Sequence, residues 1–170
     1  IAKQRLEEAR ALCERTLATA PGDADAWLLG AVIYGMLDQP GQTERYAREA
    51  IRLRPDYAEA HNSLGLALRL QGRAAEAVPV LQKAVRLKPD YADAYYNLGV
   101  ALNGLGRFSE AAESHERALT LRPRDPEVLN DLGNVLQALH RHTEAVERYR
   151  RALAPHSMPS SARARSRWHL

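Results

Sequence analysis

The chain has 170 residues, of which 45% are hydrophobic and 26% are charged, an ordinary composition for a folded, water-soluble protein. Its net charge of +3 is accounted for by three arginines in the acid-free segment Ser157 to Leu170, so the remainder is neutral. A nucleic-acid-binding fold normally carries a basic stripe, and a bilayer-spanning helix needs about 20 apolar residues. The longest uncharged apolar run, Ala26 to Leu37, is too short for this, so we expect neither a nucleic-acid partner nor a membrane partner.

The first element predicted along the chain is a helix from Lys3 to Ala20, and it contains the single cysteine, Cys13. One cysteine excludes an internal disulfide and fits a reducing compartment, so we expect a buried packing thiol and a cytoplasmic protein. The chain begins at Ile1, already inside the helical pattern, and no signal-peptide pattern is visible. We therefore expect it to be a piece of a longer polypeptide.

A proline recurs every 34 residues after this helix, at Pro21, Pro55, Pro89 and Pro123. A fixed period of this length is typical of a solenoid, in which each unit buries its apolar face against its neighbours. The period divides the chain into an incomplete N-terminal unit followed by four repeats and one last segment. Their predicted bounds are residues 1–20, 21–54, 55–88, 89–122, 123–156 and 157–170, the last forming a capping helix or the next repeat's first helix.

Each unit has the pattern of two helices, which we call helix A and helix B. In the third unit helix A is predicted from about Tyr91 to Leu105 and helix B from about Phe108 to Leu121. Gly65, Gly99 and Gly133 recur at one place in helix A, where Ala31 stands in the first unit. Because mid-helix glycine costs about 1 kcal/mol relative to alanine, this recurrence predicts a close contact with the partner helix.

This pattern resembles the tetratricopeptide repeat (TPR), on residues Tyr95, Leu98, Gly99, Ala111 and Pro123 of the third unit. The resemblance covers about residues 1–156 and implies an all-α, right-handed α-solenoid of stacked antiparallel helix pairs. The run Asn130 to Asn134 also resembles the superhelical region of O-linked N-acetylglucosamine transferases, and bacterial repeat proteins with glycosyl- or sulfotransferase domains are similar. The basic residues with which chaperone-docking members bind a C-terminal carboxylate are missing at the matching places.

No catalytic, phosphate-binding or zinc-protease motif is present, so we expect no enzyme activity in this chain and no cofactor. His140 and His142 flank a turn, but a firm zinc site needs three or four ligands, and we expect no metal. His61 and His115 occupy packing positions and are interpreted as structural.

Binding is the favoured function. The TPR resemblance implies that helices A line a concave groove, where carboxamides could bind a peptide backbone without reading its sequence. The alternative is that these amides are only solvated helix positions. In the first unit the groove positions are Asp25, Leu28, Leu29, Val32 and Met36, and the groove becomes amide-rich toward the C-terminus. The predicted peptide-binding residues are Asn62, Arg69, Asp93, Tyr96, Asn97, Asn103, Glu127, Asn130, Asp131, Asn134 and Gln137.

The sequence thus predicts a protein- or peptide-binding scaffold; the alternative is a substrate-recruiting arm of a larger transferase whose catalytic domain lies outside this chain. Acids recur in the first turn of helix A at Asp25, Glu59, Asp93 and Glu127, where they either stabilise the helix N-terminus or select basic partners. Self-association is expected through the N-terminal helix, whose face bearing Leu6, Leu12 and Leu17 lacks a helix A.

Overall fold

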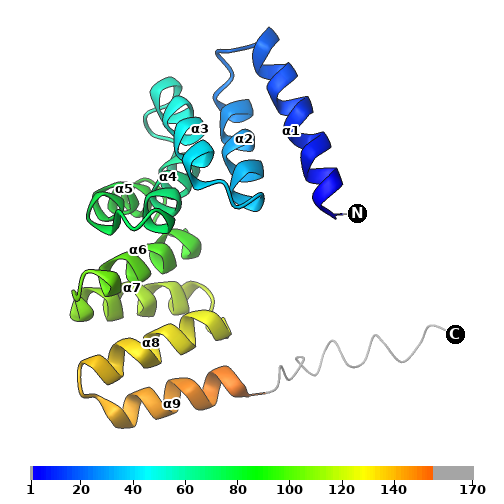
Figure 1. The fold of residues 1–170 in the computed structure, drawn as a ribbon. Coiled ribbons are helices and arrows are strands. Elements are labelled where there is room, and N and C mark those ends of the chain that lie inside the picture. Colours follow the sequence, from blue (N-terminus) through cyan, green and yellow to red (C-terminus); the bar gives the residue numbers. More distant parts are fainter. Residues whose placement is uncertain (1, 155–170) are drawn as a thin grey trace, which may run out of the picture.

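The computed structural model describes residues 2–154, which form a curved stack of helices without a strand (Figure 1). The helices are α1 (Ala2–Thr19), α2 (Ala24–Met36), α3 (Pro40–Leu53), α4 (Ala58–Leu70), α5 (Ala74–Leu87), α6 (Ala92–Gly104), α7 (Phe108–Leu121), α8 (Pro126–Ala138) and α9 (His142–Leu153). The helix predicted in residues 157–170 and the end of the predicted fourth repeat lie outside the described residues.

The turn inside each repeat has the same backbone geometry. A residue with positive φ follows each helix A, at Asp38 (φ 56°), Gly72 (φ 75°), Gly106 (φ 72°) and His140 (φ 59°). This left-handed conformation ends a helix and lets the chain reverse, and glycine adopts it without steric cost. His140, considered above as a metal ligand, thus stands at the turn position that glycine takes in the two preceding repeats.

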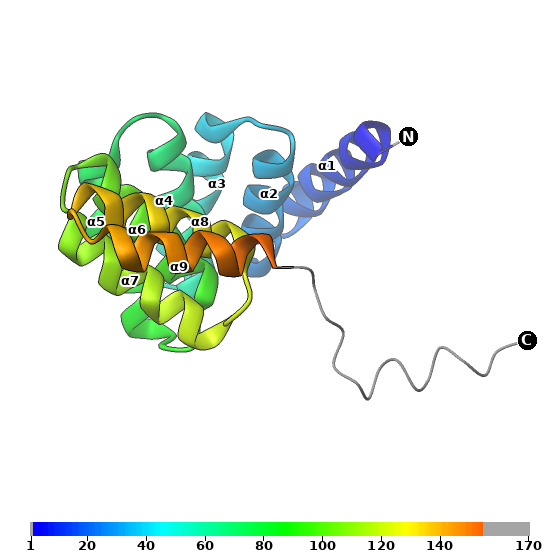
Figure 2. The ribbon, with the colours of Figure 1, turned by 90° about the horizontal axis from the view of Figure 1, so that it is seen from below.

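The helices form two layers. In the inner layer α2 lies against α4, α4 against α6, and α6 against α8. The described residues of α3, α5, α7 and α9 show no such close backbone approach among themselves. Each helix packs against the next along the chain, so the array bends toward the layer whose helices touch (Figures 1 and 2). We call the exposed surface of α2, α4, α6 and α8 the inner face.

The close contacts predicted at the recurring glycines are confirmed in three repeats. A Cβ on Gly99 would lie 2.6 Å from the His115 ring, and Gly65 and Gly133 are covered in the same way by Leu81 and Tyr149. The first repeat differs, because its close contact is between Gly30 and Tyr46. Ala31 and Ala47, both buried, stand at the positions that a glycine and a large side chain take in the later repeats. The glycine and the large side chain have both moved by one residue, which preserves the interlocking of the two helices.

The N-terminal helix α1 packs against α2 through part of its apolar surface. Cys13 and Leu17 are buried, and the Cys13 thiol donates a hydrogen bond to the Ala26 carbonyl oxygen at 3.3 Å. Burial raises the pKa of this thiol, which agrees with a packing role. The expectation that Leu17 lies on an open face is wrong, since α2 covers it; Leu12 is the exposed residue of that set, and Leu6 is half-buried.

Candidate peptide-binding groove

All the predicted peptide-binding residues lie on α4, α6 or α8, the helices that form most of the inner face, but they differ in exposure. Arg69, Tyr96, Asn103 and Asp131 are half-buried, and Asn62 and Asn97 are buried. The exposed members are Asp93, Glu127, Asn130, Asn134 and Gln137. On α2 the apolar groove positions Leu29, Val32 and Met36 are exposed as well.

The two buried asparagines pair with each other across the seam between α4 and α6. The Asn97 side-chain amide donates to Asn62 Oδ1 at 3.0 Å, and the Asn62 amide donates to the Tyr91 hydroxyl at 3.2 Å. Asn97 is only 6% exposed. The expectation that its side chain projects freely into the groove is therefore corrected, because neighbouring A helices approach closely enough to bury this position. Sequence reasoning missed Tyr91 as a partner.

The amides of α8 are more accessible. Asn130, Asn134 and Gln137 are exposed on this helix, and the Tyr149 hydroxyl of α9 lies 2.9 Å from Asn134 Oδ1 and 3.1 Å from Gln137 Oε1. Tyr149 thereby orients two of the predicted side chains, and it was not among the residues predicted from the sequence. Each carboxamide also carries an N–H₂ group that can donate to a bound chain.

Tyr96 joins α6 to α8. Its hydroxyl lies 3.0 Å from Glu127 Oε1 and 3.1 Å from Asp131 Oδ2, and burial together with the Asp131 charge raises the Tyr96 pKa. Asp93, Tyr96 and Glu127 also line one cavity of about 150 Å³ between these helices. The structure therefore brings together four predicted residues from two helices.

Three of the recurring acids are paired with the basic residue that follows helix B at the end of the same repeat. Asp25 pairs with Arg54 at 3.0 Å, Glu59 with Lys88 at 2.7 Å and Asp93 with Arg122 at 2.6 Å. Hydrogen bonds from Arg54 lower the pKa of Asp25, and one from Lys88 lowers that of Glu59. Because the paired groups are largely exposed, these bridges add little stability each, but they neutralise three of the four acids.

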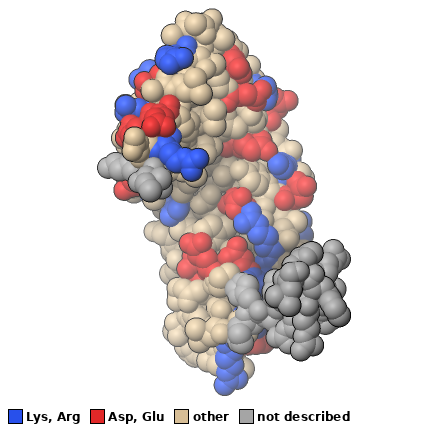
Figure 3. Space-filling view, turned by 90° about the vertical axis from the view of Figure 1, so that its right-hand side faces the viewer, with Lys and Arg blue, Asp and Glu red and all other residues tan. Residues whose placement is uncertain are grey.

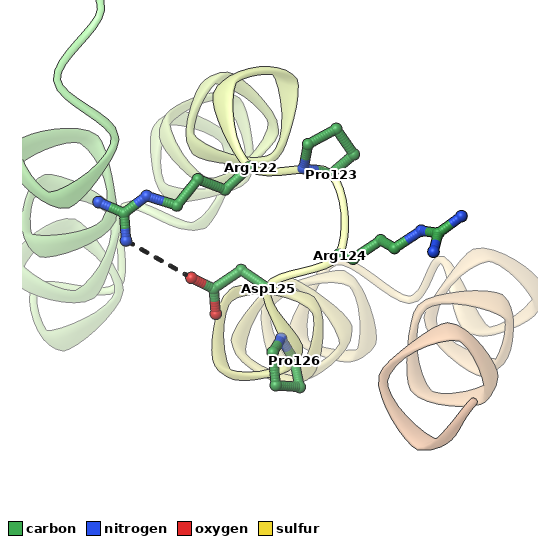
Figure 4. Close-up of a pocket in the computed structure, with 5 residues that line it drawn as sticks. All are labelled: Arg122, Pro123, Arg124, Asp125 and Pro126. Atoms are coloured by element: carbon green, nitrogen blue, oxygen red, sulfur yellow. Dashed lines mark ion pairs between the residues drawn. The ribbon is translucent and has the colours of Figure 1, made fainter. Parts of the chain in front are cut away.

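The loop from Arg122 to Pro126, between α7 and α8, borders a wide pocket of about 530 Å³ (Figure 4). Arg122 reaches over it toward Asp125, at 3.8 Å, and also pairs with Asp93. The Asp125 side chain caps α8, accepting hydrogen bonds from the backbone N–H groups of Glu127 and Val128. Arg122 and Asp125 thus link this loop to the first turns of α6 and α8.

His115 lies in the core beneath Tyr96 and Gly99. It is fully buried, neither ring nitrogen has a hydrogen-bond partner, and burial lowers its pKa to about 4. Its ring centroid is 5.8 Å from that of Tyr96. His115 is therefore a neutral packing residue, as the sequence predicted.

The described residues also bear on other kinds of site. They contain no group of three or more His, Cys, Asp or Glu side chains placed to hold a metal ion, and the His140 and His142 rings are 5.9 Å apart. None of their helices has the length and apolarity needed to cross a bilayer. Figure 3, which views the right-hand side of Figure 1, shows acidic and basic side chains interspersed rather than in a basic stripe.

Comparison with family models gives three matches. A model described as TPR repeat matches residues 65–106, and two described as tetratricopeptide repeat match residues 92–125 and 127–154. Together they cover more than half of the chain. No curated protein matches the sequence.

Solved structures with this arrangement of helices include MamA and YrrB. One MamA structure is 25% identical with a TM-score of 0.80, with 89% of each chain covered; another is 28% identical with a TM-score of 0.76, with 88% of each covered. YrrB, described as a TPR protein with an unusual peptide-binding site, is 21% identical with a TM-score of 0.73, over 88% of this chain and 77% of its own.

Proposed function

Because this chain belongs to the tetratricopeptide repeat family, we propose that it is a protein-interaction scaffold that binds an extended peptide segment along its inner face. Family membership supports the general role in protein interaction. The likeness to YrrB supports the fold only, so the choice of the inner face is argued from this chain's own side chains.

The observation that carries the proposal is the character of the inner face. Its exposed apolar groups include Leu29, Val32 and Met36 on α2, while Asn130 and Asn134 expose carboxamides on α8. A peptide backbone needs donors and acceptors along its length, and its side chains need apolar contacts, and this surface offers both. The outer layer offers few amides, since its exposed side chains are mostly charged.

The test begins with a pull-down that uses this chain as bait, followed by hydrogen exchange on the complex. We expect protection on α2, α4, α6 and α8. The double change N130A/N134A removes exposed amides, each worth about 0.5–1.5 kcal/mol net, and should weaken binding about tenfold. Changes of Arg86 and Glu113, exposed on α5 and α7, serve as controls. Protection confined to the outer helices, or binding indifferent to the double change, would exclude the inner face.

Self-association through α1 is a second part of the proposal, favoured by Leu12, which is 59% exposed. The substitution Leu12→Gln should lower the sedimentation coefficient at high protein concentration if two chains pair through this helix. A parent chain that stays monomeric at high concentration would exclude this contact.

The alternative proposal, a substrate-recruiting arm of a transferase, rests on the resemblance of the Asn130 to Asn134 run. The native reading frame beyond Leu170 tests it: a downstream α/β catalytic domain would favour the arm, and further repeats would favour the scaffold.

A further inference from the structure

The inner face changes in character from its N-terminal to its C-terminal end. On α2, Leu29 is 55% exposed, Val32 44% and Met36 67%, and on α4 Leu70 is 50% exposed. Leu70 stands 34 residues after Met36, at the same place in its helix, so the apolar surface continues from α2 to α4. Single exposed apolar side chains are normal on a protein surface, but a group spread over two touching helices marks an interaction site.

At the other end the same helical places carry acids and amides. Asp131 and Asn134 on α8 stand at the places of Leu29 and Val32, and the Tyr96 hydroxyl lies between Glu127 and Asp131. A hydroxyl has one proton, so it can donate to only one of these two carboxylates at a time. The other carboxylate is then without a side-chain hydrogen-bond donor among the described residues and is open to a donor from a bound chain.

Neither Glu127 nor Asp131 makes an ion pair among the described residues, in contrast to Asp25, Glu59 and Asp93. Glu127 lines the cavity of about 150 Å³ between α6 and α8, and Asp131 lies one turn further along α8. Arg122 also lines this cavity, but it is paired with Asp93 and Asp125, so the charges of Glu127 and Asp131 are not balanced by an ion pair among the described residues. A cationic side chain would relieve their mutual repulsion, and it would complete the hydrogen bonding around Tyr96.

We infer that the segment bound on the inner face carries apolar side chains over α2 and α4 and a lysine or arginine between α6 and α8, where Glu127 and Asp131 hold its cation. This deepens the proposed function and depends on it. Charge complementarity selects the basic residue, and it disfavours a nucleic acid, whose phosphates these carboxylates would repel.

The spacing between the two anchors follows from the geometry of the array. Packed helices lie about 8–10 Å apart, and two such steps separate the middle of the α2–α4 surface from the middle of the α6–α8 surface. An extended peptide advances about 3.3 Å per residue. The basic residue should therefore stand about five or six residues from the apolar ones.

The experiment selects binders from a library of random 12-residue peptides displayed on phage, with the chain immobilised. We expect enrichment of lysine or arginine about five or six residues from Leu, Ile, Val or Met. The most enriched peptide is then synthesised with a fluorescent label, and its affinity is measured by anisotropy at several salt concentrations.

Matched variants identify the anchors. The double change E127Q/D131N keeps the shape of both side chains but removes their charges. It should lower the affinity for the labelled peptide about tenfold and reduce the dependence of that affinity on salt concentration. Leu29→Ser and Val32→Asn introduce the residues that later repeats carry at the same places, Ser63 and Asn134. Both changes should also lower the affinity for the peptide, because they remove apolar contacts on α2. Glu113→Gln, on the outer helix α7, should leave binding unchanged.

The outcomes separate the two proposals. The cation anchor would be overturned if the selected peptides lack a basic residue, or if E127Q/D131N does not change their affinity. If N130A/N134A still lowers their affinity, the proposed peptide-binding groove is retained. A library without any selected binder, or binders insensitive to every inner-face change, would overturn both.

Discussion

At the scale of single residues, the interior of the third repeat contains a group that titrates. His115 occupies the place that Leu81 fills one repeat earlier, with its two ring nitrogens unpaired. A neutral imidazole packs there much as leucine does, but an imidazolium would bury an uncompensated charge. The pKa of His115 is consequently lowered to about 4 from an ordinary 6.5.

This shift makes the stability of the chain depend on pH. The folded-state pKa lies below the unfolded one, so between these two values the unfolded chain binds more protons. The His115 contribution is fully present above about pH 6.5, falls as pH drops toward 4, and reaches a loss of about 3 kcal/mol. Urea titrations at pH 7 and pH 4.5 should show this loss in the parent chain. His115→Leu should remove most of the difference; an equal pH response in both chains would contradict the assignment.

Gly99 faces the same ring from α6. Gly99→Leu would drive a side chain into His115, since even a Cβ would lie 2.6 Å from the ring, and should cost about 1–3 kcal/mol or more. Gly104→Leu is a matched control on the same helix, because nothing lies within 4 Å of a Cβ there. Thermal unfolding should separate the two variants by several degrees, and identical melting temperatures would disprove the close contact.

The buried asparagine pair gives a further residue-scale prediction. Asn97→Ala would leave Asn62 Oδ1 without its donor in a buried seam, and should cost about 1–3 kcal/mol. Asn130→Ala, at an exposed position of α8, should change the free energy of unfolding by less than about 0.5 kcal/mol. Equal effects in chemical denaturation would mean that the α4–α6 seam is open to water.

At the scale of elements, α3 is tied to the turn of the second repeat by one buried carboxylate. Glu44 is 7% exposed, accepts hydrogen bonds from Gln71 at 2.7 Å and from Arg73 at 2.9 Å, and pairs with Arg48 on its own helix. Burial acts to raise the Glu44 pKa, but these hydrogen bonds and the two arginine charges outweigh it and lower the pKa. The later repeats have Val78, Ala112 and Val146 at this place, so the link is specific to the first interface.

Glu44→Gln should therefore weaken the contact between the first two repeats, by about 1–2 kcal/mol in urea unfolding. Arg73 keeps its second partner, Glu76, which limits the loss. Glu76→Gln, which removes only the exposed partner, serves as the control and should have little effect. A larger effect for Glu76 than for Glu44 would contradict this account.

The helices themselves were largely predictable. Helix B of the third repeat was predicted from Phe108 to Leu121, as observed, and its helix A, predicted from Tyr91 to Leu105, spans Ala92–Gly104. Proline, glycine and apolar spacing are local signals, so one sequence suffices to place these ends. The correspondence of Gly30 with Tyr46 was missed, because Ala31 keeps the expected place while the contact moves by one residue.

The candidate site was less predictable, because it depends on contacts between helices that are far apart in the sequence. Helical periodicity separates the core side of helix A from its open side, but it does not say how near the neighbouring helix A lies. That distance decides that Asn97 is buried while Asn134 is exposed. The pairing of Asp93 with Arg122 likewise joins the start of α6 to the residue after α7, 29 positions apart, and helical periodicity does not show that these two ends meet.

At the scale of the whole molecule, the stack has contacts only between nearby elements. Central repeats are packed on both sides, whereas within residues 2–154 α1 contacts only α2, and Ala145 is the one residue of α9 that these residues bury. Stability in such an array is a sum over units and their interfaces, so the ends should open first.

Hydrogen exchange on the free chain should show this gradient. Amide protection should be highest in α4 to α7 and lowest in α1 and α9, because opening an end helix breaks fewer contacts. Mass spectrometry of peptide fragments resolves each helix separately. Uniform protection from α1 to α9 would indicate a single cooperative unit and would contradict the gradient.

The asymmetry between the two layers also has a mechanical meaning. Among residues 2–154 the backbones of neighbouring inner helices approach closely along the whole arc, whereas those of the outer helices stay further apart, so the stack can bend about the line of inner contacts. A force that draws its ends together or apart is shared among many small tilts between neighbouring repeats, and no single hinge has to absorb it. Its elastic compliance is therefore distributed along the chain, and the span of the inner face can adjust continuously to the length of what lies across it.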